Sequence, residues 1–324
     1  LKAQGPMYVV GLGHMATHWT GSTFYILLPY LAKDLALTYT AAGLLAAIMN
    51  VSSVLANIGA GALVDMTGRR TTFMAITLTL TAVGLLVMGL SPWFALMCVM
   101  VGLMGGANNA WHPAAISYLS SRYPKQRGYA LSIHSTGASG GDMMAPLVAG
   151  VLLTSLNWHE AAAFSAVPVF AVALYFWMVL LPRDASEGGA TRAATGRGSY
   201  WGGLLSLVKQ KAVVGLCLMA AFRAMAQTGL MLFLPLYLAN VMQVSPVMVG
   251  TTVMAMHFGG VIISPFAGAI SDRLGPRPVV MAGLTATTLI ILGLTFVSNS
   301  FAYIAIVSVL GFVLYAVRPV ILAW

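Results

Sequence analysis

Apolar and polar positions along this chain alternate in long blocks. Ten apolar runs are separated by polar segments, and each run is long enough to cross the hydrocarbon core of a membrane, for which about 20 helical residues suffice. The pattern predicts ten transmembrane helices, at residues 7–32, 38–64, 71–91, 93–120, 128–155, 159–181, 212–240, 246–270, 278–298 and 301–323.

The longest polar segment follows the sixth run. Residues 182–211 are rich in Gly, Ala, Ser, Thr and Arg, which is typical of a flexible linker. We therefore expect a six-helix bundle over 1–181, a cytoplasmic linker over 182–211 and a partial bundle of four helices over 212–324. Both chain ends lie close to apolar runs, so we expect the natural protein to extend further.

Polar side chains inside the runs recur on every third predicted helix. The first, fourth, seventh and tenth runs carry them, whereas the interiors of the third, sixth and ninth hold no ionisable residue. Because charge is costly in hydrocarbon, such side chains are expected to face a wet interior. The pattern predicts a central vestibule lined by the four polar helices, with every third helix facing lipid. The predicted substrate-binding residues, paired three or four apart on shared faces, are His14, His18, Asn108, His112, Arg223, Gln227, Tyr315 and Arg318.

The composition agrees with a membrane protein. Hydrophobic residues make up 59% of the 324 positions and charged residues only 7%, against about 25% charged residues in soluble domains. With a cytoplasmic N-terminus, 13 of the 16 Lys and Arg residues fall on the cytoplasmic side and only Lys33 falls outside. The net charge of +9 is therefore explained by membrane topology, with some attraction to anionic lipid, and we expect no nucleic-acid partner. We expect a multi-pass protein of the inner membrane.

One charged segment occurs twice. Residues 61–70 read Gly-Ala-Leu-Val-Asp-Met-Thr-Gly-Arg-Arg, and residues 268–277 read Gly-Ala-Ile-Ser-Asp-Arg-Leu-Gly-Pro-Arg. Asp65 and Asp272 lie 207 residues apart, each copy between two apolar runs. A repeated hairpin at matching places in two halves is typical of a transporter that arose by duplication.

The runs, the linker and these two hairpins together resemble the major facilitator superfamily. The resemblance implies an all-α membrane fold of twelve helices in two pseudo-symmetric bundles, of which about ten are present here. It also implies that the hairpins act as a conformational latch, in which carboxylate and arginine contacts form and break during transport. The alternative is that the arginines only hold the loops inside. The implied latch residues are Gly61, Asp65, Gly68, Arg69, Arg70, Asp272 and Arg277.

Two further segments resemble exporters within that superfamily. Gly141, Pro146 and Gly150 follow the spacing of an antiporter signature, with alanine at positions 145 and 149, although simple close helix packing would use the same residues. The segments Trp-His-Pro-Ala at 111–114 and Ile-His-Ser-Thr-Gly at 133–137 resemble the fosmidomycin-resistance type. This resemblance implies export of a small anionic or amphiphilic compound driven by inward proton flow. The fourth run lacks the arginine that such exporters usually carry.

The ionisable side chains leave alternatives open. Arg223, near the middle of its run, is expected to attract a carboxylate or phosphonate, or else to form an internal ion pair. Asp142, His134 and His257 are candidates for proton coupling, or else hydrogen-bonded structural groups. The sequence indicates no metal site. The His14–His18 pair has no apparent carboxylate or thiol neighbour, and further ligands would have to come from other helices.

We therefore expect a monomeric secondary transporter that works by alternating access and couples protons to export of a small amphiphilic or anionic compound. One alternative is an importer of organic anions, motivated by Arg223 and the missing arginine. Another is a non-transporting membrane sensor. No catalytic constellation, phosphate-binding loop or zinc spacing stands out in the sequence, so we expect neither an enzyme nor a cofactor.

Overall fold

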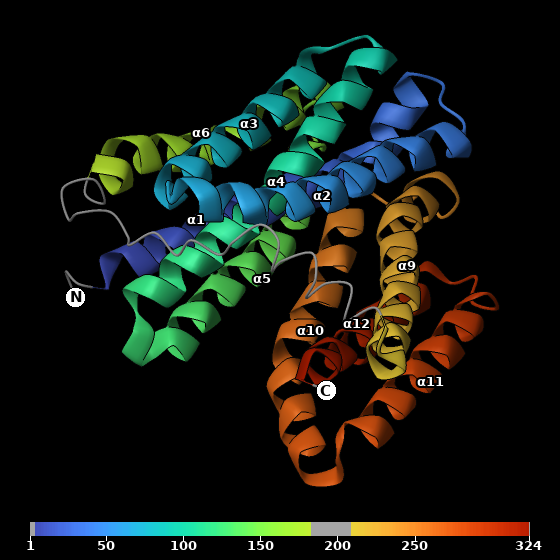
Figure 1. Cartoon of the computed structure of the whole chain (residues 1–324). Helices are drawn as coiled ribbons and strands as arrows, with labels where there is room; N and C mark the ends of the chain where they lie inside the picture. Colours follow the sequence, from blue (N-terminus) through green and yellow to red (C-terminus); the bar gives the residue numbers. More distant parts are fainter. Residues whose placement is uncertain (1–3, 183–208, 324) are drawn as a thin grey trace. The chain divides into compact units, whose positions relative to one another are not determined.

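The computed structural model describes residues 4–182 and 209–323. The chain divides into two compact units, Leu1–Ala194 and Thr195–Trp324, which are called unit 1 and unit 2. The predicted linker over 182–211 lies almost entirely outside the described residues. Long helices make up both units (Figure 1).

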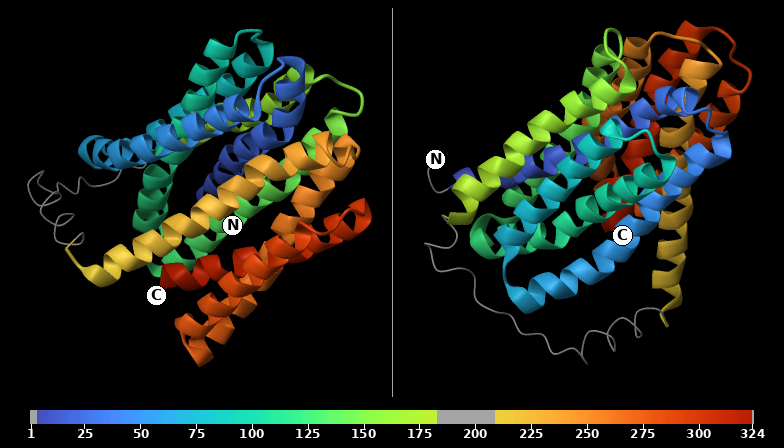
Figure 2. Two further views of the ribbon diagram at one scale, coloured as in Figure 1. Left: turned by 90° about the vertical axis from the view of Figure 1, so that its right-hand side faces the viewer. Right: turned by 90° about the horizontal axis from the view of Figure 1, so that it is seen from above.

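Unit 1 is a bundle of six long helices. They are α1 (Gly5–Asp34), α2 (Tyr39–Thr67), α3 (Arg70–Leu90), α4 (Phe94–Arg122), α5 (Arg127–Leu152) and α6 (Trp158–Tyr175), with a 3₁₀ turn at Pro124–Gln126 and a π-helical turn at Phe176–Leu180. The helix α1 packs along α5, α2 packs along α4, and α3 contacts both α4 and α6. Figure 2 shows these long helices from two further sides.

Unit 2 contributes four helices among the described residues. They are α9 (Lys211–Asn240), α10 (Pro246–Leu274), α11 (Pro276–Leu294) and α12 (Ser300–Ala323). The closest packing is between α10 and α12, where a Cβ at Gly311 would overlap the backbone of Met256. The ten described α-helices coincide with the ten apolar runs to within a few residues, except that the sixth run ends in the π-helical turn. The predicted helices are therefore confirmed.

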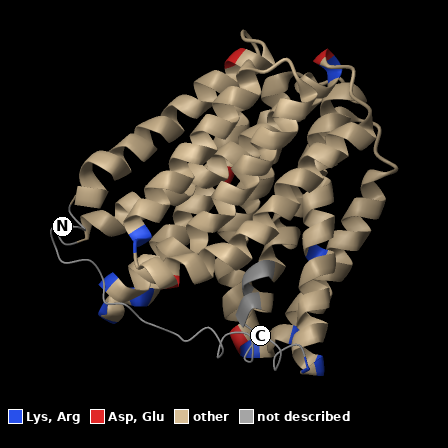
Figure 3. Ribbon diagram, turned by 45° about the horizontal axis from the view of Figure 1, so that its top comes forward, with Lys and Arg blue, Asp and Glu red and all other residues tan. Residues whose placement is uncertain are grey.

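Eight of the ten described helices are long and apolar enough to cross a membrane. The exceptions are α1 and α5, which are long but carry more polar residues, and these two helices are direct neighbours. Figure 3 shows the charged residues gathered mostly at helix ends, with the middles of the helices almost free of them. On α1, His14, Thr17, Thr20 and Thr23 are buried, and on α5 His134 is buried, so part of the polar content of these two helices faces protein.

The repeated hairpin has the same backbone role in both units. Gly68 follows α2 with a φ of +66°, and Gly275 follows α10 with a φ of +84°. Glycine adopts these positive angles without the steric penalty that a Cβ would bring. Each copy thus ends one helix and begins the next, as the repeat in the sequence predicts.

The expectation that every third helix faces lipid stays a prediction, and α3 is packed more closely than that expectation suggests. This helix buries 56% of its most apolar stretch inside unit 1, a larger share than any of the other seven apolar helices that are described. The reason is that α4 and α6 both pack against it. A lack of ionisable residues marks an apolar environment, but it does not separate lipid from protein interior.

Candidate functional site

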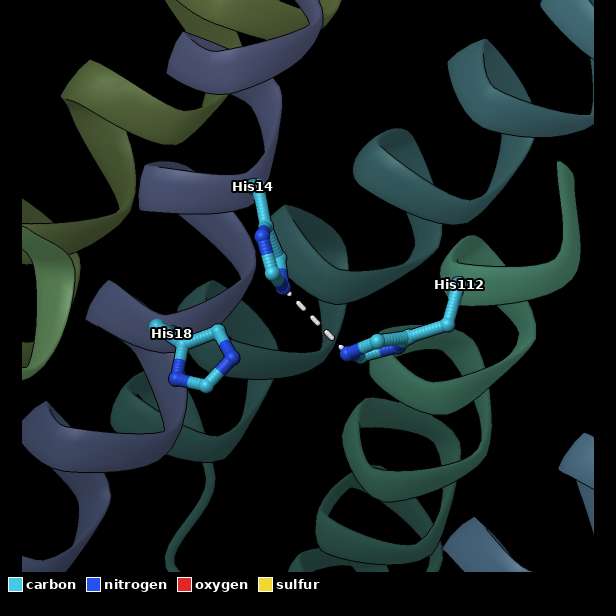
Figure 4. Close-up of side chains that lie close together, drawn as sticks. All are labelled: His14, His18 and His112. Carbon is cyan, nitrogen blue, oxygen red and sulfur yellow. Dashed lines mark hydrogen bonds between the residues drawn. The ribbon is translucent and has the colours of Figure 1, made fainter. Parts of the chain in front are cut away.

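Four histidines from three helices of unit 1 form one cluster. His14 and His18 lie on α1, His112 on α4 and His134 on α5. The ring of His14 stacks on that of His134 with centroids 3.7 Å apart, and its centroid is 4.7 Å from that of His18 and 4.9 Å from that of His112. Figure 4 shows the side chains of His14, His18 and His112 converging on one point.

Each of these three converging rings is held by an oxygen at its Nδ1 atom. Nδ1 of His14 lies 2.7 Å from the backbone oxygen of His134, and Nδ1 of His112 lies 3.1 Å from the backbone oxygen of Asn108. Nδ1 of His18 lies 3.0 Å from Oδ2 of Asp142. The Nε2 atoms of His14 and His112 are 3.2 Å apart. The rings are therefore oriented by the helices around them.

Asp142 on α5 supplies the carboxylate of this cluster. Its Oδ1 atom accepts a hydrogen bond of 2.8 Å from the hydroxyl of Ser22 on α1. The side chains of His18 and Asp142 are 24% and 23% exposed, so the pair is only partly shielded. The sequence interpretation that the His14–His18 pair lacks a nearby carboxylate is wrong, because α5 packs along α1 and brings Asp142 to it.

A second polar contact joins α1, α3 and α4. The amide of Asn108 donates a hydrogen bond of 3.1 Å to the hydroxyl of Thr20, and its side-chain oxygen accepts one of 3.1 Å from Thr81. Thr20, Thr81 and Ser22 are hydrogen-bond partners of the candidate residues that the sequence did not single out. The spacing of Ser22, four residues after His18 on the same helix face, is the one signal that could have found it.

The antiporter-like segment lies where α5 approaches α1 most closely. A Cβ at Gly141 would overlap the backbone oxygen of Met15, and one at Gly137 would overlap that of Gly11. Pro146 lies inside α5, and both it and Gly150 are buried. Small residues thus allow the backbone contact that places Asp142 beside His18.

In unit 2, the predicted residues form two separate pairs. The guanidinium of Arg223 donates a hydrogen bond of 3.0 Å to the side-chain oxygen of Gln227, four residues along α9. Nε2 of His257 on α10 lies 3.4 Å from the hydroxyl of Tyr315 on α12, and each of the two residues is 9% exposed. The side chain of Arg318 lies outside the described part of the chain. The vestibule shared by the polar helices of both halves stays a prediction.

The hairpin residues lie at the surface of their units. Asp65 is exposed in the last turn of α2, and Asp272 and Arg277 are exposed on either side of Gly275. Arg70 donates a hydrogen bond of 2.6 Å to the hydroxyl of Ser121 on α4. Among the described residues, Asp65 forms no ion pair with Arg69 or Arg70. The contact between Asp65 and the neighbouring arginines that the sequence suggested is therefore not formed in this conformation.

Long apolar helices around an enclosed polar network define a multi-pass membrane protein whose interior is adapted to polar groups. The sequence profile of the Major Facilitator Superfamily matches residues 10–324, so the chain belongs to this family of membrane transporters. The resemblance drawn from the sequence is thereby confirmed.

Relatives and solved structures agree with this assignment. The chain is 23% identical over 312 residues to the MFS-type transporter YfnC of Bacillus subtilis, covering 95% of this chain and 75% of YfnC. It is 27% identical over 300 residues to the multidrug resistance protein MdtG of Enterobacter lignolyticus, covering 86% of this chain and 68% of MdtG.

Two solved structures show the same fold at low identity. An inward-facing bacterial homologue of the human lysosomal transporter Spinster superposes with a TM-score of 0.81 at 17% identity, covering 99% of this chain and 74% of that one. The nucleoside transporter NupG gives 0.76 at 14% identity, covering 96% and 79%. The predicted fold class, an all-α major facilitator fold, is confirmed.

Proposed function

We propose that this protein is a secondary active exporter that moves a small amphiphilic or anionic compound by alternating access, driven by inward proton flow. The observation that carries this proposal is the partly buried polar network of unit 1, in which His14 contacts His112, His18 contacts Asp142, and Asn108 binds Thr20 and Thr81. Relatives such as MdtG are named for multidrug resistance, which supports export as the direction. We place the protein in the inner membrane with a cytoplasmic N-terminus, on the distribution of Lys and Arg.

The network supports a transport function because polar side chains inside membrane helices are energetically unfavourable and are retained mainly where a function uses them. Polar and charged groups inside membrane helices are expensive and mark substrate or ion pathways. Asn108 forms hydrogen bonds with Thr20 and Thr81, whereas the side chains of His18 and Asp142 are partly exposed. Partly exposed polar side chains between apolar walls suit a compound that has both apolar and polar parts.

The contact with an anionic substrate is assigned to Arg223. Its place near the middle of α9 keeps the guanidinium far from the helix ends, and Gln227 orients it through a hydrogen bond of 3.0 Å. A fixed guanidinium binds carboxylates and phosphonates with two parallel hydrogen bonds. This geometry favours a substrate with a negatively charged group.

The coupling ion is proposed to be the proton. The close approach of α1 and α5 at Gly141 fits the antiporter-like signature in α5. Of the three residues that the sequence suggests for proton coupling, Asp142 and His134 belong to the histidine cluster of unit 1. The third, His257, lies outside it and contacts the hydroxyl of Tyr315. Imidazole is the side chain that gains and loses a proton most readily near neutral pH. We assign the coupling role to His257 and a supporting role to Tyr315.

The hairpins are proposed to act as a latch between conformations. Arg70 joins the start of α3 to the end of α4 through Ser121, while Asp65 remains exposed in the conformation described. An arginine with two alternative acceptors, one hydroxyl and one carboxylate, can exchange one for the other as helices shift. The bond to Ser121 would then belong to one state of the transport cycle.

The test uses proteoliposomes that contain purified protein and a trapped pH-sensitive dye. A panel of amphiphilic and anionic compounds is added outside, with protein-free liposomes as the control. An antiporter makes the lumen more alkaline as the compound enters, whereas a symporting importer makes it more acidic. Alkalinisation that His257→Gln abolishes, while downhill exchange of the compound continues, supports the proposal. Acidification, or no flux of any compound by folded protein, overturns it.

A further inference from the structure

We propose that His14, His18 and His112 of unit 1 form a binding site for a divalent transition-metal ion of the zinc class. Each side chain offers one ring nitrogen, and these atoms all lie within 4.8 Å of one another. The ion would lie between α1 and α4 at the point where the three rings converge (Figure 4). The metal site uses side chains of the polar network described above and goes beyond the proposed transport function, and its test is separate from the transport test.

The hydrogen bonds at Nδ1 prepare the other nitrogen for a metal. A backbone carbonyl can only accept, so His14 and His112 must each donate an Nδ1–H, to the oxygens of His134 and Asn108. The carboxylate of Asp142 likewise accepts from Nδ1 of His18. In a neutral imidazole whose Nδ1 is protonated, Nε2 carries a lone pair. The surroundings thus select, in all three rings, the tautomer that ligates through Nε2.

The distance between two of these atoms suits a cation held between them, either a metal ion or a shared proton. The Nε2 atoms of His14 and His112 are 3.2 Å apart, and two lone pairs at that distance repel each other. A zinc ion with bonds of about 2.0–2.1 Å in tetrahedral geometry holds two nitrogens about 3.3 Å apart. The pair therefore already has the separation of two ligands on one metal ion. Figure 4 shows a ring nitrogen of His18 turned toward the same point.

The groups behind the ligands match those of natural metal sites. Metal-binding histidines almost always donate their second ring N–H to a carboxylate or a backbone carbonyl, which fixes the ring and raises its basicity. Here Asp142 accepts the hydrogen bond from Nδ1 of His18, and the hydroxyl of Ser22 in turn donates a hydrogen bond to Asp142. Three imidazoles favour zinc, copper, nickel or cobalt over magnesium and calcium, which prefer oxygen ligands.

A fourth buried imidazole lies against the cluster. The ring of His134 stacks on His14 with centroids 3.7 Å apart, and the residue is only 4% exposed. Neither of its ring nitrogens has a hydrogen-bond partner within the described residues. A buried polar group without a partner is costly. A metal ion or its bound water beside the cluster would supply that missing partner.

The site has a route for entry and room for one more ligand. His14 is buried, whereas His18 and His112 are partly exposed, so an ion can reach the cluster from their side. Three protein ligands leave the fourth position of a tetrahedral ion for water or another molecule. Such an open position distinguishes this site from a closed structural zinc site.

The experiment measures metal binding directly on the full chain, purified in detergent with a tag that contains no histidine. Zn²⁺ binding is followed by calorimetry and by metal content after dialysis, and Co²⁺ binding by the visible absorption of a tetrahedral cobalt complex. We expect one ion per chain. His18→Gln and His112→Gln should each weaken Zn²⁺ binding by more than about tenfold, since each removes one of three ligands. The cobalt absorption should disappear in the double variant.

The matched control is His159→Gln, because His159 lies at the start of α6, outside the cluster. It should bind Zn²⁺ and Co²⁺ as the wild type does. Melting curves recorded without metal establish that every variant is folded. Absence of stoichiometric binding by the wild type overturns the proposal, as does binding that survives in the double variant. Both readouts are independent of transport, so a negative result here leaves the proposed exporter function to its own test.

Discussion

The carboxylate of Asp142 on α5 lies 3.0 Å from Nδ1 of His18 on α1 and joins the two long helices of unit 1 that are too polar to count as candidate membrane spans. Its second oxygen accepts a hydrogen bond from the hydroxyl of Ser22, also on α1. One side chain thus holds two donors of the neighbouring helix. Within the described part of unit 1, this is the contact that explains how a carboxylate is tolerated inside a membrane helix.

Replacing Asp142 by alanine should destabilise the protein by about 1–3 kcal/mol, because His18 and Ser22 would both lose a partly buried acceptor. Asp142→Asn should cost less, since its amide oxygen can still accept a hydrogen bond. The measurement is the melting temperature in detergent, recorded without metal. Asp65→Asn, at an exposed carboxylate on α2, is the control and should leave the melting temperature unchanged. Equal melting temperatures for Asp142→Ala and the wild type would contradict this account.

Asp142→Asn should nevertheless weaken Zn²⁺ binding by about 10–100-fold, because a metal ligand loses the carboxylate behind it. At a Zn²⁺ concentration of about 100 times the dissociation constant, binding stabilises a folded protein by about 2.7 kcal/mol. The upward shift of the melting temperature on adding Zn²⁺ should therefore be large in the wild type and much smaller in Asp142→Asn at the same concentration. An identical shift in both proteins would remove Asp142 from the metal site.

Two adjacent glycines on α5 provide a test of close packing. A Cβ at Gly141 would overlap the backbone oxygen of Met15, whereas one at Gly140 would meet the side chain of Met15 at 3.6 Å or more, an ordinary contact. Gly141→Ala should therefore cost about 1–3 kcal/mol through displaced helices. Gly140→Ala should be neutral or stabilise by up to about 1 kcal/mol through helix propensity. Melting temperatures of the two variants decide the matter, and a larger loss at Gly140 would refute the α1–α5 geometry.

The helices and the family were predictable from the sequence because each depends on local pattern. The apolar runs set the helix bounds, and the repeated hairpin places Gly68 and Gly275 at equivalent turns with positive φ. The site was predictable only in part. The spacing of His14 and His18 shows that they share a helix face, but their nearness to His112 and Asp142 depends on which helices pack together.

Helix pairing is the information that the sequence pattern lacks. Residues 120 or more positions apart meet in the contacts of His14 with His134 and of His18 with Asp142, and no periodicity relates them. The same lack of pairing information applies to α3, whose apolar sequence is equally compatible with lipid and with the packing of α4 and α6 around it. The prediction of no metal site depended in part on the absence of a carboxylate near His14 and His18, and Asp142 on another helix supplies that carboxylate.

The latch can be tested at the contact between α3 and α4. Ser121→Ala removes the acceptor that Arg70 uses in the conformation described, so the balance should shift toward the state in which Arg70 has another partner. We expect a change in transport rate of about two- to tenfold, since a hydrogen bond to a charged group contributes about 1.5–3 kcal/mol when buried and less at a surface. Initial rates of export measure it. Ser132→Ala, at an exposed serine of α5, is the control, and equal effects of both variants would argue against a latch.

Arg223 should determine affinity for anionic substrates. Arg223→Gln removes the fixed positive charge near the middle of α9, and loss of a charge-assisted hydrogen bond costs about 1.5–3 kcal/mol, or roughly 10–100-fold in KM. Arg223→Lys keeps the charge without the two parallel donors, so its KM for the anion should lie between those of the wild type and Arg223→Gln. Gln227→Leu should reproduce part of the loss, because Gln227 orients the guanidinium. The assay compares KM for an anionic compound with KM for a neutral compound of similar size in proteoliposomes. Transport of both compounds is expected to continue, with the penalty confined to the anion, and an equal loss for the neutral compound would show that Arg223 serves the fold rather than recognition.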